Sequence, residues 1–396
     1  MTTVTSLARR RFLRFLAASP LLPHLPVQQL GAQQLTKAED GLSVMDFEAA
    51  AKSAVPPAHW GYMTSGVDDD LTLKANHEAF QHYRLRARRL VDVSKPDLRT
   101  EVFGQTWESP IFICPCGSQH AFHADGELAT ARAAKAKQTQ MILSTQTSFP
   151  IEDVNKTYGK PVWFQLYTTS RWDATEKLVK RAEDSGSPVL VFTVDQQVGR
   201  NTETQARIRP QDKRNCGACH EGGGPNTFSQ KGKPMYAGID TSGIALVDPA
   251  LTWTSVDRLK KFTRMKLVLK GIVTREDAIL ARQHGADGII VSNHGGRAEE
   301  SGLGTIDCLA EVVDGAGPLP VMLDGGVRRG TDVYKALALG ARAVGIGRPY
   351  LWGLSAFGQP GVEKVLDILR AELQLTMGQC GTPGIKQITK AFVQKA

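Results

Sequence analysis

The stretch "PVMLDGGVRRGTDVYKALALGARAVGIGRP", which runs from Pro320 to Pro349, decides the fold of this chain. It contains a short apolar run, two glycines, a helical pattern and a second apolar run that ends in "GIGRP". A strand, a crossover helix and a second strand in this order form a parallel βαβ unit. Glycines and arginines follow both strands directly, which predicts a functional edge at their carboxyl ends.

Eight apolar runs of this kind alternate with helical patterns along the chain. They are "IFICP" from Ile111, "MILST" from Met141, "VWFQLY" from Val162, "VLVFTVD" from Val189, "LVLKG" from Leu267, "GIIVSN" from Gly288, "PVMLDGG" from Pro320 and "AVGIG" from Ala343. Eight strand and helix units satisfy the closure count of a barrel. An open doubly wound sheet is the alternative, but polar and glycine residues follow nearly every run, as at a barrel mouth. We therefore predict the α/β class and a (β/α)8 TIM barrel.

Two segments interrupt this alternation. About seventy residues separate the fourth run from the fifth, far more than a normal βα loop contains. A helical lead-in segment, residues 42–109, precedes the barrel and is expected to cap one of its faces. The predicted organisation is a leader at 1–34 and a barrel domain at 35–396, with an inserted loop at 197–250.

Much of the net positive charge of the chain comes from one short segment near its start. The chain has 48 basic and 40 acidic residues and a formal net charge of +8. Arg9, Arg10, Arg11 and Arg14 supply half of that excess, and no long basic run remains without them. With 41% hydrophobic and 22% charged residues the chain has a globular composition, and we predict no nucleic-acid partner.

The first segment, "SLARRRFLRFLAASPLLPHLPVQQLGAQQ", resembles a signal peptide. It has a basic region, a modest apolar stretch and polar residues after a small-residue site near Ala32. Arg9-Arg10-x-Phe12-Leu13-Arg14 resembles the twin-arginine export signal, which predicts a periplasmic protein. The alternative is an ordinary basic start with a loose tail. Prolines interrupt the apolar stretch, so no transmembrane helix is expected.

The ends of the seventh and eighth runs predict a phosphate site. Gly326 and Arg328 follow the seventh run, and Gly347 and Arg348 follow the eighth. Backbone amides at a glycine turn and a helix N-terminus bind phosphate, and arginine adds positive charge. A phosphate site after strands seven and eight recurs in TIM barrels.

The ends of the fourth to sixth runs carry candidate catalytic groups. His294 can take a substrate proton and Arg297 can bind a carboxylate, both within "SNHGGR". A histidine at a strand end is more often structural, but here it lies beside an arginine and a phosphate site. Lys270, inside the barrel, requires an anionic partner, and Asp195 could fix the tautomer of His294.

The motifs "SNHGGR", "LDGGVRRGTDVYKALALGARAVGIGRPYLWGL", "FQLY" and "LVLKG" resemble the FMN-dependent 2-hydroxy-acid oxidase and dehydrogenase family, over most of Leu42 to Gly381. The resemblance implies that His294 is the base, Asp195 its support, and that Arg297 and Tyr167 contact the substrate. It places Lys270 at the flavin N1–O2 edge. The residues that it assigns to the flavin ring and its ribityl phosphate are Pro115, Cys116, Gly117, Ser144, Gln165, Thr193, Ser292, Asp324, Gly326, Arg328, Gly347 and Arg348.

Three positions depart from the family pattern. Trp60 stands where we expect the substrate-binding tyrosine of the lead-in segment. Thr202 aligns with a second carboxylate-binding arginine, with Arg200 as a nearby cation, and Gln146 replaces an aromatic residue after the second strand. These changes favour a larger hydroxy acid, or a related secondary alcohol, over glycolate or lactate.

The inserted loop carries "RNCGACHEGG". The order Cys216-x-x-Cys219-His220 is typical of a c-type haem attachment site, with His220 as the proximal ligand and Met235 as the axial candidate. A disulfide between the two cysteines or a zinc site is the alternative. The remaining cysteines are Cys114, Cys116, Cys308 and Cys380.

Together these features predict a periplasmic FMN-dependent 2-hydroxy-acid dehydrogenase. Electrons would pass from the flavin to haem c and then to a periplasmic cytochrome. The alternatives are an oxidase that uses O2 and an exported flavin electron-transfer or binding protein that turns over no small hydroxy acid. A homo-oligomer is compatible with the sequence.

Overall fold

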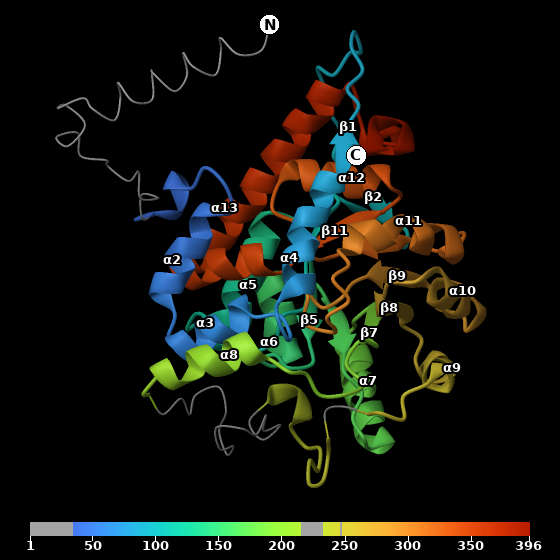
Figure 1. Cartoon of the computed structure of the whole chain (residues 1–396). Coiled ribbons are helices and arrows are strands. Elements are labelled where there is room, and N and C mark those ends of the chain that lie inside the picture. Colours follow the sequence, from blue (N-terminus) through green and yellow to red (C-terminus); the bar gives the residue numbers. More distant parts are fainter. Residues whose placement is uncertain (1–34, 215–232, 246–247) are drawn as a thin grey trace, which may run out of the picture. The chain divides into compact units, whose positions relative to one another are not determined.

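The computed structural model describes residues 35–214, 233–245 and 248–396. Within them, eight parallel strands close into a barrel that the helices surround (Figure 1). In barrel order the strands are β4 (Ile111–Ile113), β5 (Gln140–Ser144), β6 (Trp163–Leu166), β7 (Val189–Thr193), β8 (Lys266–Ile272), β9 (Gly288–Val291), β10 (Val321–Leu323) and β11 (Ala343–Ile346). The pairing of Val344 with Ile111 joins β11 to β4 and closes the ring. This closure confirms the predicted (β/α)8 barrel and excludes the open sheet.

The strands alternate their side chains between two apolar layers, as the period of a β-strand requires. Phe112 belongs to an inner cluster, whereas Ile111 and Ile113 belong to the outer layer that packs against the helices. A hairpin of β2 (Thr100–Val102) and β3 (Gln105–Trp107) completes the inner cluster. Its Trp107 contacts Trp163 with ring centroids 5.3 Å apart. The end of the lead-in segment therefore fills one end of the barrel.

The helices of the outer layer follow the strands in chain order. They are α5 (Gly126–Ala136), α6 (Ile151–Tyr158), α7 (Trp172–Asp184), α9 (Trp253–Phe262), α10 (Arg275–Gln283), α11 (Thr305–Ala316), α12 (Gly330–Ala338) and α13 (Arg348–Cys380). Helix α13 bends at Gly358, which has a positive φ of 62°, close to Pro360. None of the helices in the described ranges is both long and apolar enough to cross a membrane.

The lead-in segment contacts the last helix and the last strand of the described chain. It forms α2 (Asp46–Ala54), α3 (Pro57–Thr64), α4 (Leu71–Glu78) and β1 (Tyr83–Leu85). Helix α2 packs along α13 (Figure 1), and β1 pairs antiparallel with β12 (Val393–Lys395). The helices before the barrel are thus fixed by the last described strand and helix.

The inserted loop begins with α8 (Glu203–Ile208), which packs against α3. The backbone amide of Asp68 donates to the carbonyl of Asn201 at 2.9 Å. Farther along, the 3-10 turn Pro234–Tyr236 is buried, and Arg181 of α7 donates to the carbonyl of Pro234. The described parts of the loop are therefore tied both to the lead-in segment and to the barrel helices.

Candidate active site

A pocket opens at the carboxyl ends of the barrel strands. Its hollow measures about 820 Å³ with the solvent at its mouth included. The predicted site residues in its wall are Pro115, Cys116, Gly117, Tyr167, Lys270, His294, Arg297, Asp324, Gly326, Arg328, Gly347 and Arg348. Tyr62, Met63 and Leu351 line it as well. The structure thus brings together residues from the lead-in segment and from most of the barrel strands.

His294 follows β9 with a left-handed backbone, at a φ of 59°. Gly295 and Gly296 continue the turn with φ values of 68° and 76°. A non-glycine residue in this region is strained by about 1–3 kcal/mol, and such strain is found mainly at functional sites. The glycines of "SNHGGR" therefore permit the turn that directs His294 into the pocket.

The imidazole of His294 is held by two side chains. Its Nδ1 lies 2.9 Å from Oδ1 of Asp195, and its Nε2 lies 3.2 Å from the hydroxyl of Tyr167. Burial lowers the pKa of His294, against the effect of Asp195. Burial raises the pKa of Asp195, but its interactions with His294 and Lys270 bring the pKa below the ordinary value. An ionised Asp195 accepts from Nδ1, which leaves Nε2 as the basic atom beside Tyr167.

Arg297 lies against the end of helix α3. Its Nη1 donates to the carbonyls of Tyr62 and Ser65, each at 2.7 Å, and the guanidinium lies 4.6 Å from the centroid of the Tyr62 ring. Trp60 packs in the hydrophobic core instead. The expectation that Trp60 occupies the tyrosine position is therefore wrong, because Tyr62 is the aromatic residue of α3 in the pocket wall.

Lys270 is a buried cation on β8. Its Nζ donates to Oγ of Ser292 at 2.9 Å and lies 3.4 Å from Oδ2 of Asp324. Burial lowers the pKa of Lys270, but Asp324 and Asp195 outweigh that effect and raise it above its ordinary value. Ser292 in turn donates to Asp324 at 2.6 Å. These contacts keep a positive charge at the centre of the pocket.

Ser144, Gln165 and Thr193 form a buried row across three neighbouring strands. Ser144 donates to Oε1 of Gln165 at 3.0 Å, and Nε2 of Gln165 donates to Thr193 at 2.9 Å. A Cβ added to Gly117 would come within 3.3 Å of Oγ of Ser144. Ser144, at one end of the row, therefore lies beside Gly117 in the segment that follows β4.

Arg328 and Arg348 bring further positive charge into the same pocket. Burial lowers the pKa of Arg328 to about 10 and that of Arg348, which also lies near Arg297, to about 9. Arg328 stacks on Trp352, with its guanidinium carbon 4.7 Å from the ring centroid. In the described ranges, neither arginine forms a salt bridge. Two desolvated guanidinium groups without a carboxylate partner are suited to bind a phosphate dianion.

The pocket fits the FMN that the sequence predicts. Gly326 has a φ of 74°, and a side chain there would collide with the carbonyl of Asn76. Gly117 and Gly347 let the backbone come close to a bound ring or phosphate. The cationic Lys270, the polar row and the two arginines match a flavin ring at one end and a phosphate at the other.

Sequence reasoning missed Gln196 and named Arg200 only as a nearby cation. Gln196, directly after Asp195, lies 3.1 Å from Nε2 of His294. Arg200 donates from Nη1 to the backbone carbonyl of Arg297 at 3.2 Å. Thr202, in contrast, is the N-cap residue of α8 and does not line the pocket. The order Asp-Gln-Gln after a strand gave no signal that the first glutamine would face the histidine.

The predicted haem residues lie mostly outside the described ranges. Cys216, Cys219 and His220 fall there, whereas Met235 is fully buried in the core. Its neighbour Tyr236 accepts a hydrogen bond from Nε2 of Gln146 at 3.1 Å. Gln146 is therefore held by the inserted loop, a contact that the sequence did not predict.

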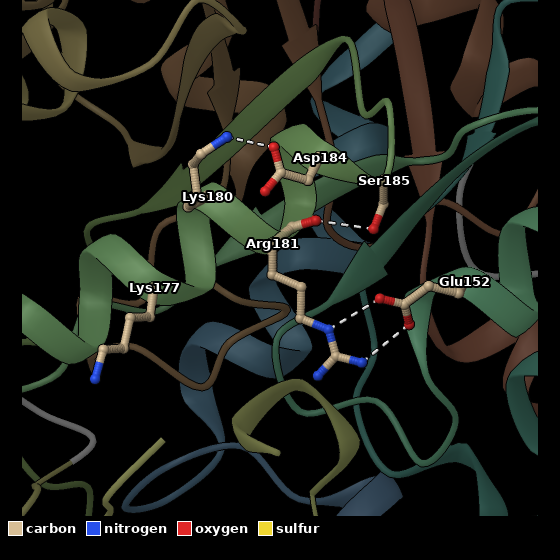
Figure 2. A pocket seen from close by; sticks show the side chains of 6 residues that line it. All are labelled: Glu152, Lys177, Lys180, Arg181, Asp184 and Ser185. Atoms are coloured by element: carbon tan, nitrogen blue, oxygen red, sulfur yellow. Dashed lines mark hydrogen bonds and ion pairs between the residues drawn. The ribbon is translucent and has the colours of Figure 1, made fainter. Parts of the chain in front are cut away.

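A second hollow lies outside the barrel, between α6 and α7 (Figure 2). Figure 2 shows that four of its charged side chains are paired: Arg181 contacts Glu152, and Lys180 contacts Asp184, whereas Lys177 has no contact drawn. Ser185 donates to the carbonyl of Arg181 at 2.8 Å. These contacts join two outer helices, so we assign the site to the barrel mouth.

Comparison with known proteins identifies a family whose cofactor is the one that this pocket fits. The model of the FMN-dependent dehydrogenase family matches residues 51–395, so the chain belongs to that family. It is 41% identical over 358 residues to the peroxisomal (S)-2-hydroxyacid oxidase GLO3 of Arabidopsis thaliana, covering 89% of this chain and 96% of the relative. A 2-hydroxyacid oxidase of Dictyostelium discoideum is 41% identical over 377 residues, covering 92% and 93%. An active chimera of (S)-mandelate dehydrogenase superposes with a TM-score of 0.80 at 34% identity, covering 90% of this chain and 99% of the chimera.

These relatives correct one prediction from the sequence. We expected a periplasmic protein exported by the twin-arginine route, but the similar curated proteins include oxidases named as peroxisomal. The prediction of a periplasmic location is therefore wrong. The arginine motif on which it rested, within residues 1–34, lies outside the described residues.

Proposed function

We propose that this protein is an FMN-dependent oxidase that converts a 2-hydroxy acid to the 2-keto acid and passes the electrons to O2. One 2-hydroxy acid and one O2 give one 2-keto acid and one H2O2, which balances atoms and electrons. The observation that carries the proposal is that His294, which Asp195 holds at 2.9 Å, lines one pocket with Arg297. The relatives named as oxidases support O2 as the acceptor.

In this proposal each residue has a distinct task. Arg297 binds the substrate carboxylate, and Nε2 of His294 takes the proton of the hydroxyl. Asp195 holds the imidazole in the required tautomer and stabilises the protonated form. Burial raises the pKa of Tyr167, so its hydroxyl stays protonated and can bond to the substrate. FMN, when bound, accepts the two electrons that leave the substrate carbon.

The cofactor would be held by the groups already described. Lys270 would face the ring, and the row of Ser144, Gln165 and Thr193 would bond to its polar edge. Arg328 and Arg348 would bind the phosphate beside the glycine turns. These residues would exclude water from one side of the ring and would orient it toward His294.

The substrate follows from the residues that differ from the family pattern. Tyr62 supplies an aromatic ring and a hydroxyl, so two of the three predicted departures remain, at Gln146 and Thr202. The side chain of Gln146 donates a hydrogen bond to Tyr236 and does not line the pocket. Arg200 provides a positive charge near Arg297. We propose a 2-hydroxy acid with a side chain larger than that of glycolate or lactate.

Peroxide formation tests the acceptor. Purified FMN-loaded protein, mixed with a panel of 2-hydroxy acids in air, is expected to form one H2O2 per keto acid. The flavin colour should bleach without air and return when O2 is admitted. Bleaching with slow return in O2 but fast return with cytochrome c would instead support a dehydrogenase. No bleaching by any member of the panel would support a binding or electron-transfer protein.

A covalent haem c remains a second candidate, because the sequence contains Cys216-x-x-Cys219-His220. The periplasmic location, which would have favoured haem attachment, no longer supports this candidate. Intact-mass measurement of protein made with haem-attachment machinery should then show a gain of one haem, which Cys216→Ala with Cys219→Ala abolishes. A loss of two hydrogens would indicate a disulfide, and bound zinc a metal site. If haem is attached, Met235→Leu should lower its potential only if Met235 is the axial ligand.

A further inference from the structure

The side chain of Gln196 lies between His294 and Arg200. One atom of its amide is 2.9 Å from Nη1 and 3.1 Å from Nη2 of Arg200, and 3.1 Å from Nε2 of His294. A guanidinium group donates hydrogen bonds and accepts none. The amide atom that faces both groups is therefore the oxygen, held by both arms of Arg200.

This oxygen distinguishes the two protonation states of His294. The same atom also lies 3.5 Å from Nδ1, so the oxygen lies over the imidazole ring and is not in line with an Nε2–H bond. It therefore acts on the ring through its partial negative charge, which favours the cationic form. Nδ1 already donates to Asp195, and a proton on both nitrogens makes the ring cationic. The hydroxyl of Tyr167 makes no such distinction, because it can either donate to Nε2 or accept from it.

We propose that Gln196 is a positioning residue that stabilises His294 after it has taken the substrate proton. The inference rests on the proposed function, in which Nε2 of His294 is the proton acceptor. Arg200 fixes the amide so that its oxygen, rather than its nitrogen, meets the imidazole. Gln196 thereby places the negative end of a dipole between two positive charges.

The surroundings of His294 make this contribution necessary. Asp195, at the end of β7, favours the cationic ring, and Tyr167 follows β6. Burial, Lys270 of β8 and Arg200 all disfavour the cationic ring and lower the pKa of His294. Arg297, on the same loop as His294, adds a further positive charge to the pocket. Asp195 is thus the one carboxylate in contact with the ring among the described residues, and the oxygen of Gln196 is a second group with negative charge density beside it.

Two substitutions with opposite expected effects test the proposal. Gln196→Met removes the amide dipole and should lower the pKa of His294 by up to about one unit, which corresponds to ~1.4 kcal/mol. Gln196→Glu places a carboxylate there and should raise the pKa by about the same amount. The pKa is measured by NMR titration of the His294 ring in FMN-loaded protein without substrate. The acid limb of kcat/KM should move in the same directions.

Gln197→Met is the matched control. Gln197 is exposed and donates to the carbonyl of Leu251 at 3.0 Å, so neither the titration nor the pH profile should move. Equal shifts in Gln196→Met and Gln196→Glu, or no shift in either, would overturn the proposal. If the wild type oxidises no 2-hydroxy acid, the proposed function fails, while the NMR titration still decides the role of Gln196.

Discussion

Replacing His294 with Gln should slow reduction of the flavin by substrate at least ~10²-fold, the usual scale for a lost general base. Gln retains a polar side chain but has no basic atom to take the hydroxyl proton. Flavin content should stay close to that of the wild type, because His294 contacts Asp195 and Tyr167 rather than the arginines of the phosphate end. Stopped-flow absorbance of the flavin under anaerobic conditions measures the rate.

The chain contains a second histidine and aspartate pair that serves as the control. Nδ1 of His284, at the C-cap of α10, lies 2.8 Å from Oδ1 of Asp257 on α9, outside the pocket. His284→Gln should therefore leave flavin reduction within about twofold of the wild type. Because His294 has a positive φ, a His294→Asn variant is a second test, since Asn adopts this backbone more readily. Near-normal reduction in both His294 variants would show that another group is the base.

Replacing Arg328 with Met should weaken FMN binding by about 10- to 100-fold. Hydrogen bonds between a guanidinium and a phosphate contribute ~1.5–3 kcal/mol, and about 1.4 kcal/mol corresponds to a factor of ten in affinity. Met keeps much of the apolar contact with Trp352 and removes the charge. Quenching of FMN fluorescence on titration with apo-protein gives the dissociation constant.

The neighbouring Arg329 provides the control for this measurement. Its side chain is 49% exposed and pairs with Glu372 at 3.2 Å, so Arg329→Met should leave FMN affinity unchanged. High salt should weaken FMN binding to the wild type more than to Arg328→Met, because a charge interaction is lost in the variant. If Arg328→Met and Arg329→Met bind FMN with equal affinity, Arg328 does not bind the phosphate.

The barrel could be predicted because its signals are local. Each strand is a short run of apolar residues buried on both faces. The residues that follow the strands lie at the same end of the barrel, regardless of the conformation of the loops. His294 and Arg297 could therefore be assigned to the barrel mouth from their positions after a strand, and the family resemblance placed Lys270 at the flavin in the same pocket. The structure places all three in that pocket.

The errors within the site came from features that depend on helix rotation or on contacts between residues far apart in the sequence. Trp60 and Tyr62 are two positions apart on one helix, so their side chains point about 200° apart, and motif alignment chose the wrong one. The contacts of Gln196 with Arg200 and of Gln146 with Tyr236 join residues through loop conformations. No spacing rule encodes such contacts, because the loop path between the residues is not periodic.

The pairing of β1 with β12 sets the order in which the protein can be completed during synthesis. Residues 83–85 obtain their partner strand only after residues 393–395 have left the ribosome. The pocket wall itself needs residues from Tyr62 to Leu351. At ~5–20 residues per second, that much chain takes roughly 20 to 70 s to make. A nascent chain therefore has no complete flavin site for most of its translation, and FMN is expected to enter late, into a barrel that is almost finished.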